Sequence, residues 1–189
     1  MNAAMTTALM TTEELLALPD DGIDRELIRG VLREKEMTRR NRQHARTEAR
    51  LTYLLESWLD TQPEPRGQVF SGEAGCILQR NPDTTVGIDV VYITAEMVSR
   101  QSDSTTMIEG PPLLAVEILS PSDRQQDINA KVDEYLTTGV AVVWIVDPHF
   151  RTVTVHRADA EPVLFNVDHH LSSESHLPGL SISVRDIFR

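Results

Sequence analysis

Two acidic residues lie inside apolar segments, where a charged side chain requires a compensating partner. Asp89 lies inside the apolar segment VGIDVVYIT, and Glu117 lies inside LLAVEILS. A carboxylate among apolar side chains costs free energy unless a cation or hydrogen-bond donors compensate it. Lys131 follows in a segment with helical character, 14 residues after Glu117. These three residues are therefore the first candidates for a functional site.

Two carboxylates and a lysine are suited to phosphodiester hydrolysis. Carboxylates on neighbouring strands can share one Mg²⁺ ion, whose other ligands are a backbone carbonyl, water and substrate phosphate. A lysine directed at the same point can stabilise charge on a phosphoryl transition state or orient the attacking water. The combination indicates a metal-dependent nuclease, with Mn²⁺ as a substitute for Mg²⁺.

Plainer explanations exist for each residue alone. An acid in a strand pattern usually lies at a strand end or pairs with a nearby Arg or Lys. Asp127 and Lys131 have i, i+4 spacing, and such a surface pair contributes only about 0.3 kcal/mol. Trp144 and Tyr135 are expected to pack in the core. Only the joint pattern of Asp89, Glu117 and Lys131 favours a site.

The surrounding pattern predicts one mixed α/β domain. Residues 25–37 form a hairpin around Gly30, and Gly139 ends the helix that Ser122 or Asp123 begins. A short helix is expected within 11–22, ended by Pro19 and the turn residues after it. Further helices are expected at 41–62, 95–101 and 121–139, with a helical turn near the C-terminus. Strands are expected at 72–94 (a pair with a turn at 81–83), 113–120, 141–148, 152–157 and 162–167. The order predicts helices around a central sheet, with residues 1–10 as a flexible N-terminus and 11–189 as the domain.

The segments RELIRGVL, GIDVVYI and PPLLAVEILSPSDRQQDINAKVDEYLTTGVAVVWIVDP, followed by TVTVHR, resemble a known family. They are similar to the Uma-type family of restriction-endonuclease-like proteins, within the PD-(D/E)XK nuclease superfamily. The resemblance runs from about Thr11 to the C-terminus. It implies a restriction-endonuclease-like fold: a core of four mixed strands flanked by helices, with the N-terminal hairpin and C-terminal strands added.

The resemblance also implies residue roles. Asp89 and Glu117 match the family's acidic motif and would bind the metal, together with the backbone carbonyl of Ile118. The superfamily lysine usually lies two residues after the glutamate, where this chain has Leu119, and in this family the helix residue Lys131 takes its place. The sequence departs from the common Pro-Asp motif, because Ile88 precedes Asp89.

Two further residues match the family pattern, Glu26 in the hairpin and His44 near the start of the long helix. Both would line the site as a ligand, a water-orienting group or a phosphate contact. For His44, a structural role or an i, i+4 pair with Glu48 is an equal alternative.

Composition limits the possible partners. The chain has 189 residues and a net charge of −11, which argues against broad, non-specific nucleic-acid binding. Basic residues gather in RRNRQHARTEAR, where Arg42, Arg46 and Arg50 form one helical stripe. That stripe is either a solvated face or a surface that follows DNA phosphates. One cysteine, no secretory signal and no long apolar run predict a cytoplasmic protein without a membrane segment.

Three hypotheses follow. The first is a Mg²⁺-dependent DNA endonuclease that uses Asp89, Glu117 and Lys131, with Glu26 and His44 in secondary roles. The second is a nuclease-fold module that binds nucleic acid or regulates but cuts poorly, which the acidic charge and Ile88 favour. The third, a purely structural domain, leaves the charged residues unexplained. A homodimer would suit cleavage of both strands of a duplex.

Overall fold

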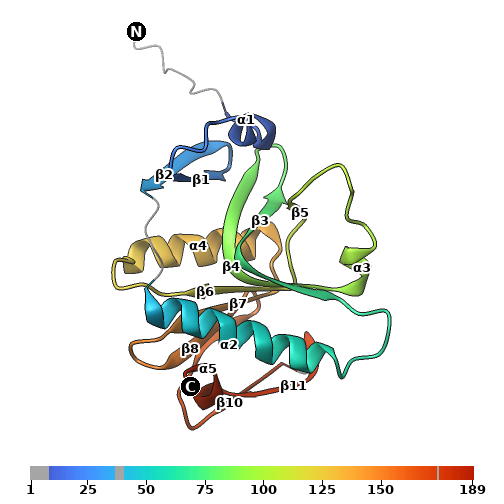
Figure 1. The fold of residues 1–189 in the computed structure, drawn as a ribbon, viewed down its shortest axis with the longest axis vertical. Coiled ribbons are helices and arrows are strands. Elements are labelled where there is room, and N and C mark those ends of the chain that lie inside the picture. The colour runs from blue at the N-terminus through green and yellow to red at the C-terminus, as the bar shows by residue number, and fades with distance from the viewer. Residues whose placement is uncertain (1–8, 37–40, 174) are drawn as a thin grey trace.

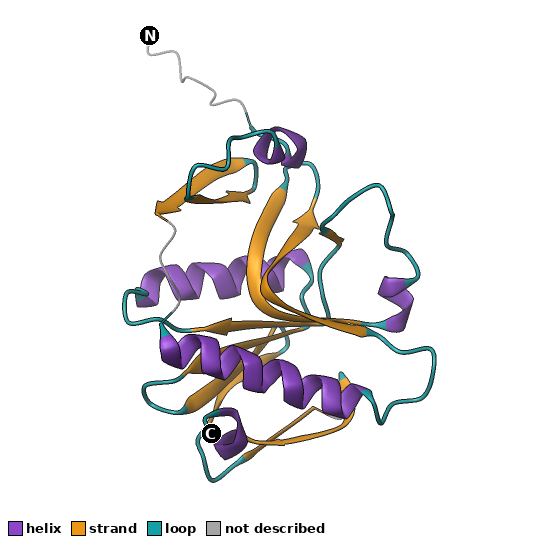
Figure 2. Ribbon diagram, viewed as in Figure 1, coloured by secondary structure: helices purple, strands orange, loops and turns teal. Residues whose placement is uncertain are grey.

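A nine-stranded mixed sheet organises the described part of the chain, which comprises residues 9–36, 41–173 and 175–189 of a computed structural model. Helices flank this sheet, and a separate two-stranded sheet packs near the C-terminus (Figures 1 and 2). The predicted fold class is confirmed, and the sheet is wider than the expected four-stranded core. The helices are α1 (Thr12–Leu16), α2 (Arg42–Leu59), α3 (Ala95–Val98), α4 (Gln125–Thr138) and α5 (Val184–Ile187).

The sheet has the order β2-β1-β4-β6-β7-β8-β9, and β3 pairs with both β4 and β5. Only β6 with β7 and β3 with β5 are parallel pairs among the described strands. The strands are β1 (Ile23–Ile28), β2 (Val31–Glu36), β3 (Gln68–Gln79), β4 (Thr84–Ile93), β5 (Ile108–Glu109), β6 (Leu114–Ile118), β7 (Val142–Asp147), β8 (Thr152–Arg157) and β9 (Ala160–Phe165).

Strand β4 links the two halves of the sheet. Its first residues pair with β1 at Thr85, and residues 90–92 pair with β6. Figure 1 shows β3 and β4 rising past α4 toward the β1–β2 hairpin. The hairpin lies alongside α4, where Glu26 contacts Lys131 and Arg29 contacts Glu134. The hairpin, β4 and α4 thus surround the carboxyl end of β6.

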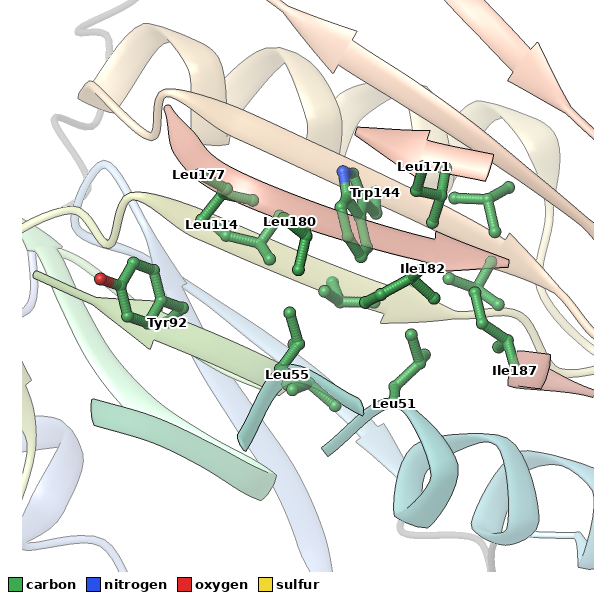
Figure 3. Packing of buried hydrophobic residues seen from close by; sticks show 14 of the residues in the cluster. Leu51, Leu55, Tyr92, Leu114, Trp144, Leu171, Leu177, Leu180, Ile182 and Ile187 are labelled. Atoms are coloured by element: carbon green, nitrogen blue, oxygen red, sulfur yellow. The ribbon is translucent and has the colours of Figure 1, made fainter. Parts of the chain in front are cut away.

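The two faces of the sheet bury two apolar clusters. Side chains alternate between faces along a strand, so Val116 packs toward α2 while Ala115 packs toward α4. Figure 3 shows the α2-side cluster, in which Leu51 and Leu55 meet Trp144 and the C-terminal strands. The same alternation places Glu117, two residues after Ala115, on the α4 side.

The β1–β2 hairpin turns through Arg29 and Gly30, which have φ angles of 53° and 75°. Positive φ at both central residues is the geometry of a type I′ turn. Arg29, which lacks glycine's freedom, is held there because its backbone N–H donates to Thr84 Oγ1 and its Nε donates to Glu134 Oε2. The predicted hairpin is confirmed.

The predicted cap of α4 is wrong. The N-cap residue is Arg124, which makes no side-chain capping hydrogen bond. Asp123 instead accepts a hydrogen bond from the Ser120 backbone N–H at 2.7 Å and lies 3.6 Å from Lys35 Nζ. Its carboxylate is therefore engaged elsewhere. Gly139 ends α4 as expected, with a φ of 104°.

The sequence prediction missed a second sheet. Strands β10 (His170–Ser173) and β11 (Leu177–Ser183) pair antiparallel before the predicted helical turn. Leu171, Leu177, Leu180 and Ile182 are buried in the α2-side cluster.

At the N-terminal end of the described chain, the Met10 backbone N–H donates to Gly30 O. Residues 1–8 of the predicted flexible N-terminus lie outside the described residues.

Candidate active site

Glu117 lies near the carboxyl end of β6 and points toward α4. Its Oε1 accepts a hydrogen bond from the Tyr135 hydroxyl at 2.6 Å, and Lys131 Nζ lies 3.4 Å from Oε1 and 3.3 Å from Oε2. Lys131 and Tyr135 are four residues apart on α4, so they share one helix face. The helix thus supplies both the cation and the hydrogen-bond donor that make a carboxylate tolerable at this position.

Lys131 connects Glu117 to the N-terminal hairpin. Its Nζ also lies 3.4 Å from Glu26 Oε1 on β1. The described ion pairs of Lys131 therefore join it to two acids across the fold, and the alternative surface pair with Asp127 is not formed. Its side chain is only one-third exposed, which places the ammonium group inside the site.

Asp89 is held from two directions. Its Oδ2 accepts a hydrogen bond from the Ile118 backbone N–H at 2.7 Å, and His44 Nε2 lies 3.2 Å from the same oxygen. The first contact ties β4 to the residue that directly follows Glu117. Ile88, where the family pattern has proline, is fully buried in the α4-side core, and Asp89 keeps its place in the site.

His44 lies behind Asp89 rather than in the open part of the site. It is fully buried in α2. Its Nδ1 has no hydrogen-bond partner within the described residues, and lies 3.8 Å from Glu48 Oε2. This arrangement suits a residue that orients Asp89. The same ring faces Asp89 through Nε2 and Glu48 through Nδ1. A position at the site and the i, i+4 pairing with Glu48, given above as alternatives, therefore occur together.

The charges in the site influence one another strongly. Burial raises the pKa of Glu117 to about 7, against the opposing effect of Lys131, and Asp89 adds to the rise. Burial lowers the pKa of Lys131, but the carboxylates of Glu117 and Glu26 outweigh it and raise that pKa above its usual value. Burial and the adjacent Glu117 raise the pKa of Tyr135 well above 10. Tyr135 therefore stays a hydrogen-bond donor at neutral pH.

A cavity of about 870 Å³ opens onto these side chains. Its walls come from the β1–β2 hairpin, the middle of β4, the end of β6, the loop after β6 and the first half of α4. Eight of its lining residues are acidic and four are basic. The acids are Asp24, Glu26, Glu34, Glu73, Asp89, Glu117, Asp123 and Asp127, and the bases are Arg33, Lys35, Arg124 and Lys131.

The donor set suits a hard cation bound largely through water. Asp89, Glu117 and the Ile118 backbone are adjacent across β4 and β6, as the contact between Asp89 and Ile118 shows. Mg²⁺ commonly uses only one or two carboxylates and completes its shell with water and phosphate. The described residues hold no group of three or more His, Cys, Asp or Glu side chains arranged as a closed metal cage. The fit is therefore to an open two-carboxylate site.

The arginine stripe of α2 makes contacts within the protein. Arg46 Nε donates to Arg189 O at 2.9 Å, and Arg50 Nε donates to Asp186 O at 3.2 Å. Arg42 and Arg46 also line a separate shallow hollow with Arg151. The structure thus places this stripe against the C-terminal residues, outside the cavity that contains Glu117. Its contact with nucleic acid stays a prediction.

Tyr135 is the site residue that sequence reasoning missed. It was expected to pack in the core, and it is indeed fully buried. Its hydroxyl nevertheless donates to Glu117. A signal was present, since Tyr135 follows Lys131 by one helical turn and must share its face. A buried tyrosine also generally finds a partner for its hydroxyl.

Comparison with known proteins gives the family. A family model described as "Uma2: Putative restriction endonuclease" matches residues 12–185. The chain belongs to the Uma2 family. The match includes every residue of the site, so the family resemblance read from the sequence is confirmed.

One solved structure similar to this Uma2 protein is a crystal structure from Anabaena variabilis, titled a putative nuclease belonging to DUF820. The two chains are 24% identical, the TM-score is 0.76, and the match covers 95% of this chain and 97% of the other. This likeness establishes a common fold. A comparison with curated proteins found no match. Among the described helices, none has both the length and the apolar character needed to span a membrane.

Proposed function

We propose that this protein is a metal-dependent endonuclease that hydrolyses DNA phosphodiester bonds. The observation that carries the proposal is the meeting of Asp89, Glu117 and Lys131, from β4, β6 and α4, at one cavity. Membership of a restriction-endonuclease family supports nuclease chemistry in general. The proposal goes further than the family in naming the metal, the DNA substrate and the roles of individual residues.

Asp89, Glu117 and the Ile118 carbonyl would hold Mg²⁺, or Mn²⁺ in its place. When bound, such an ion supplies Lewis-acid activation of the phosphate and lowers the pKa of a bound water. His44 and the Ile118 N–H fix the orientation of Asp89. Tyr135 holds Oε1 of Glu117, so the carboxylate keeps one orientation.

Lys131 provides the positive charge for the substrate. A preorganised cation in a partly buried site stabilises a phosphoryl transition state more strongly than one in open water. The raised pKa of Lys131 keeps it charged at neutral pH. Glu26 holds the ammonium group from the hairpin side, which makes it a positioning residue for Lys131.

Cleavage of DNA tests the proposal directly. Supercoiled plasmid and circular single-stranded DNA would be incubated with the wild type and the variants Asp89→Asn, Glu117→Gln and Lys131→Met, each with Mg²⁺ or Mn²⁺. Each variant is expected to lose about a hundredfold or more of the cleavage rate, the usual cost of removing one key electrostatic contact. Glu161→Gln changes an exposed acid on β9 and is the control, with an unchanged rate expected.

A second candidate function is a module that binds nucleic acid or regulates without efficient cleavage. The excess of acids lining the cavity and the net charge of −11 favour it. Calorimetric titration of Mn²⁺ into wild type and Glu117→Gln separates the two candidates. A folded wild type that does not cut DNA with either metal ion would overturn the endonuclease proposal, and failure to bind Mn²⁺ through Glu117 would further favour the second candidate. A homodimer stays a prediction that analytical ultracentrifugation can measure.

A further inference from the structure

The β1–β2 hairpin presents one charged face to the cavity. Side chains alternate along strands, and the cavity is lined by Asp24 and Glu26 from β1 and by Arg33 and Lys35 from β2. These residues lie in register, with Asp24 opposite Lys35 and Glu26 opposite Arg33. On this face, acids occupy the inner strand β1 and cations occupy β2, the strand at one end of the main sheet's order. Glu34 of β2 also lines the cavity, and its carboxylate accepts a hydrogen bond from Arg25 Nε at 2.9 Å.

The two cations of β2 have a spacing that suits a nucleic-acid backbone. Arg33 and Lys35 are two residues apart on one strand face, so their Cα atoms lie about 6.7 Å apart. Successive phosphates of an extended single strand have a comparable separation. Both side chains are exposed, so both can reach a phosphate without burying an ion.

The opposite side of the cavity carries a matching cation. Lys35 Nζ lies 3.6 Å from Asp123 Oδ1, so the hairpin and the loop after β6 approach each other across the cavity. Arg124, the next residue, is exposed and also lines the cavity. A strand passing between these walls would meet Arg33 and Lys35 on one side and Arg124 on the other.

An intact duplex fits this geometry poorly. The ion pair between Lys35 and Asp123 narrows the cavity, and opening this one pair makes room for a single backbone rather than for the two backbones of a double helix. A second backbone would also meet acids of the cavity, such as the half-buried Asp24 and the exposed Asp127, and like charges repel. One strand following β2 keeps its phosphates near the cations.

We propose that Arg33, Lys35 and Arg124 form a phosphate clamp that guides one extended DNA strand to Lys131, so that the substrate is single-stranded or unpaired DNA. The inference rests on the proposed endonuclease function and specifies its substrate class. The ion pair between Lys35 and Asp123 opens when phosphate replaces the carboxylate. Lys35 is well exposed and Asp123 is half-buried, and ion pairs near the surface contribute little, so opening is not costly.

Binding in the Glu117→Gln background tests the clamp without cleavage. Fluorescence anisotropy would compare a labelled, non-self-pairing single-stranded DNA oligonucleotide with its blunt duplex, in Mg²⁺ and at about 50 to 200 mM salt. The single strand is expected to bind more tightly. Adding Arg33→Gln and Lys35→Gln is expected to weaken its binding roughly tenfold or more and to lower the salt slope by about 1.4, or 0.7 for each phosphate contact. Arg124→Gln alone should weaken it less.

The matched control is the pair Arg100→Gln and Arg185→Gln in the same background. It removes the same net charge from exposed sites outside the cavity, so its affinity should stay near that of the parent. Equal weakening by both pairs, or a duplex that binds as tightly as the single strand, would overturn the clamp. Thermal melting of each variant verifies folding.

Cleavage by the wild type on the same two DNAs separates this inference from the function on which it rests. Faster cutting of the single strand supports both proposals. Equal cutting of the duplex overturns the single-strand inference and leaves the endonuclease intact. Clamp-dependent binding without any cutting supports the clamp and overturns the endonuclease.

Discussion

Glu117 is a carboxyl group whose ionisation the fold makes unfavourable. Its side chain is 15% exposed, and burial with nearby Asp89 and Glu26 raises its pKa from 4.5 to about 7. Lys131 and Tyr135 reduce this rise without cancelling it. An acid kept in such a position at the expense of stability is typical of functional sites.

Replacing Glu117 by Gln should therefore have a pH-dependent effect on stability. Between pH 4.5 and about 7 the unfolded chain ionises Glu117 while the folded chain keeps it protonated, so wild-type stability falls as pH rises. Across this window, the unfolding free energy of the variant relative to wild type should rise by about 1 to 3 kcal/mol. Urea denaturation in EDTA at several pH values measures the difference.

The control for this prediction is Glu161→Gln on the exposed edge of β9. Its stability relative to wild type should not change over the same pH window. A constant difference between wild type and Glu117→Gln would show that the fold does not disfavour the ionised carboxylate.

At the scale of elements, Asp83 fastens α1 to the start of β4. Its Oδ2 accepts hydrogen bonds from the Thr12 backbone N–H at 2.8 Å, the Thr12 hydroxyl at 2.7 Å and Arg80 at 2.8 Å. The Gly30 backbone N–H also donates to Asp83 O. The same residue thus connects α1 and the hairpin that forms a wall of the site.

Asp83→Asn should destabilise the protein by about 2 kcal/mol at pH 7. Burial opposes ionisation of Asp83, but the bonds from Thr12 and Arg80 outweigh it and lower its pKa from 3.8 to about 2. The stabilisation is therefore fully present above pH 4 and is lost as pH falls through about 2. Denaturation of both proteins at neutral and acidic pH measures this, and the exposed-turn variant Asp159→Asn should show no such effect.

At the scale of the whole molecule, α2 holds the C-terminus in place. Arg46 and Arg50 donate to carbonyl oxygens of Arg189 and Asp186, and Arg50 also lies 5.2 Å from the centre of the Tyr53 ring. These contacts attach α5 to the outer side of α2. These contacts explain the presence of Arg46 and Arg50 on α2 without any contact to nucleic acid.

The double variant Arg46→Gln and Arg50→Gln should lower the unfolding free energy by about 1 to 3 kcal/mol. Its affinity for single-stranded DNA should fall less than that of the Arg33 and Lys35 variant, because the stripe lies outside the cavity. Denaturation and anisotropy on the same preparations measure both effects. A stable variant that binds DNA much more weakly would instead favour a phosphate contact for the stripe.

Local sequence patterns determined the hairpin, the main helices and most strands. Their signals are the period of apolar residues, the turn residues and the glycine after α4. The apolar neighbours of Asp89 and Glu117 marked both acids as unusual. Leu180 and Ile182 also alternate with serines, so β11 was readable, but Pro178 and Gly179 concealed it because both residue types are rare in strands.

Only the tertiary structure decided which charges meet. Tyr135 reaches Glu117, Glu26 reaches Lys131, and Asp123 turns from the expected helix cap to Ser120 and Lys35. These partners lie far apart in sequence or compete with local contacts, and sheet order and helix packing select among them. The sequence by itself therefore determined the fold class and the reactive residue types. Packing decided the cavity, the shifted pKa of Glu117 and the opposing walls at Lys35 and Asp123.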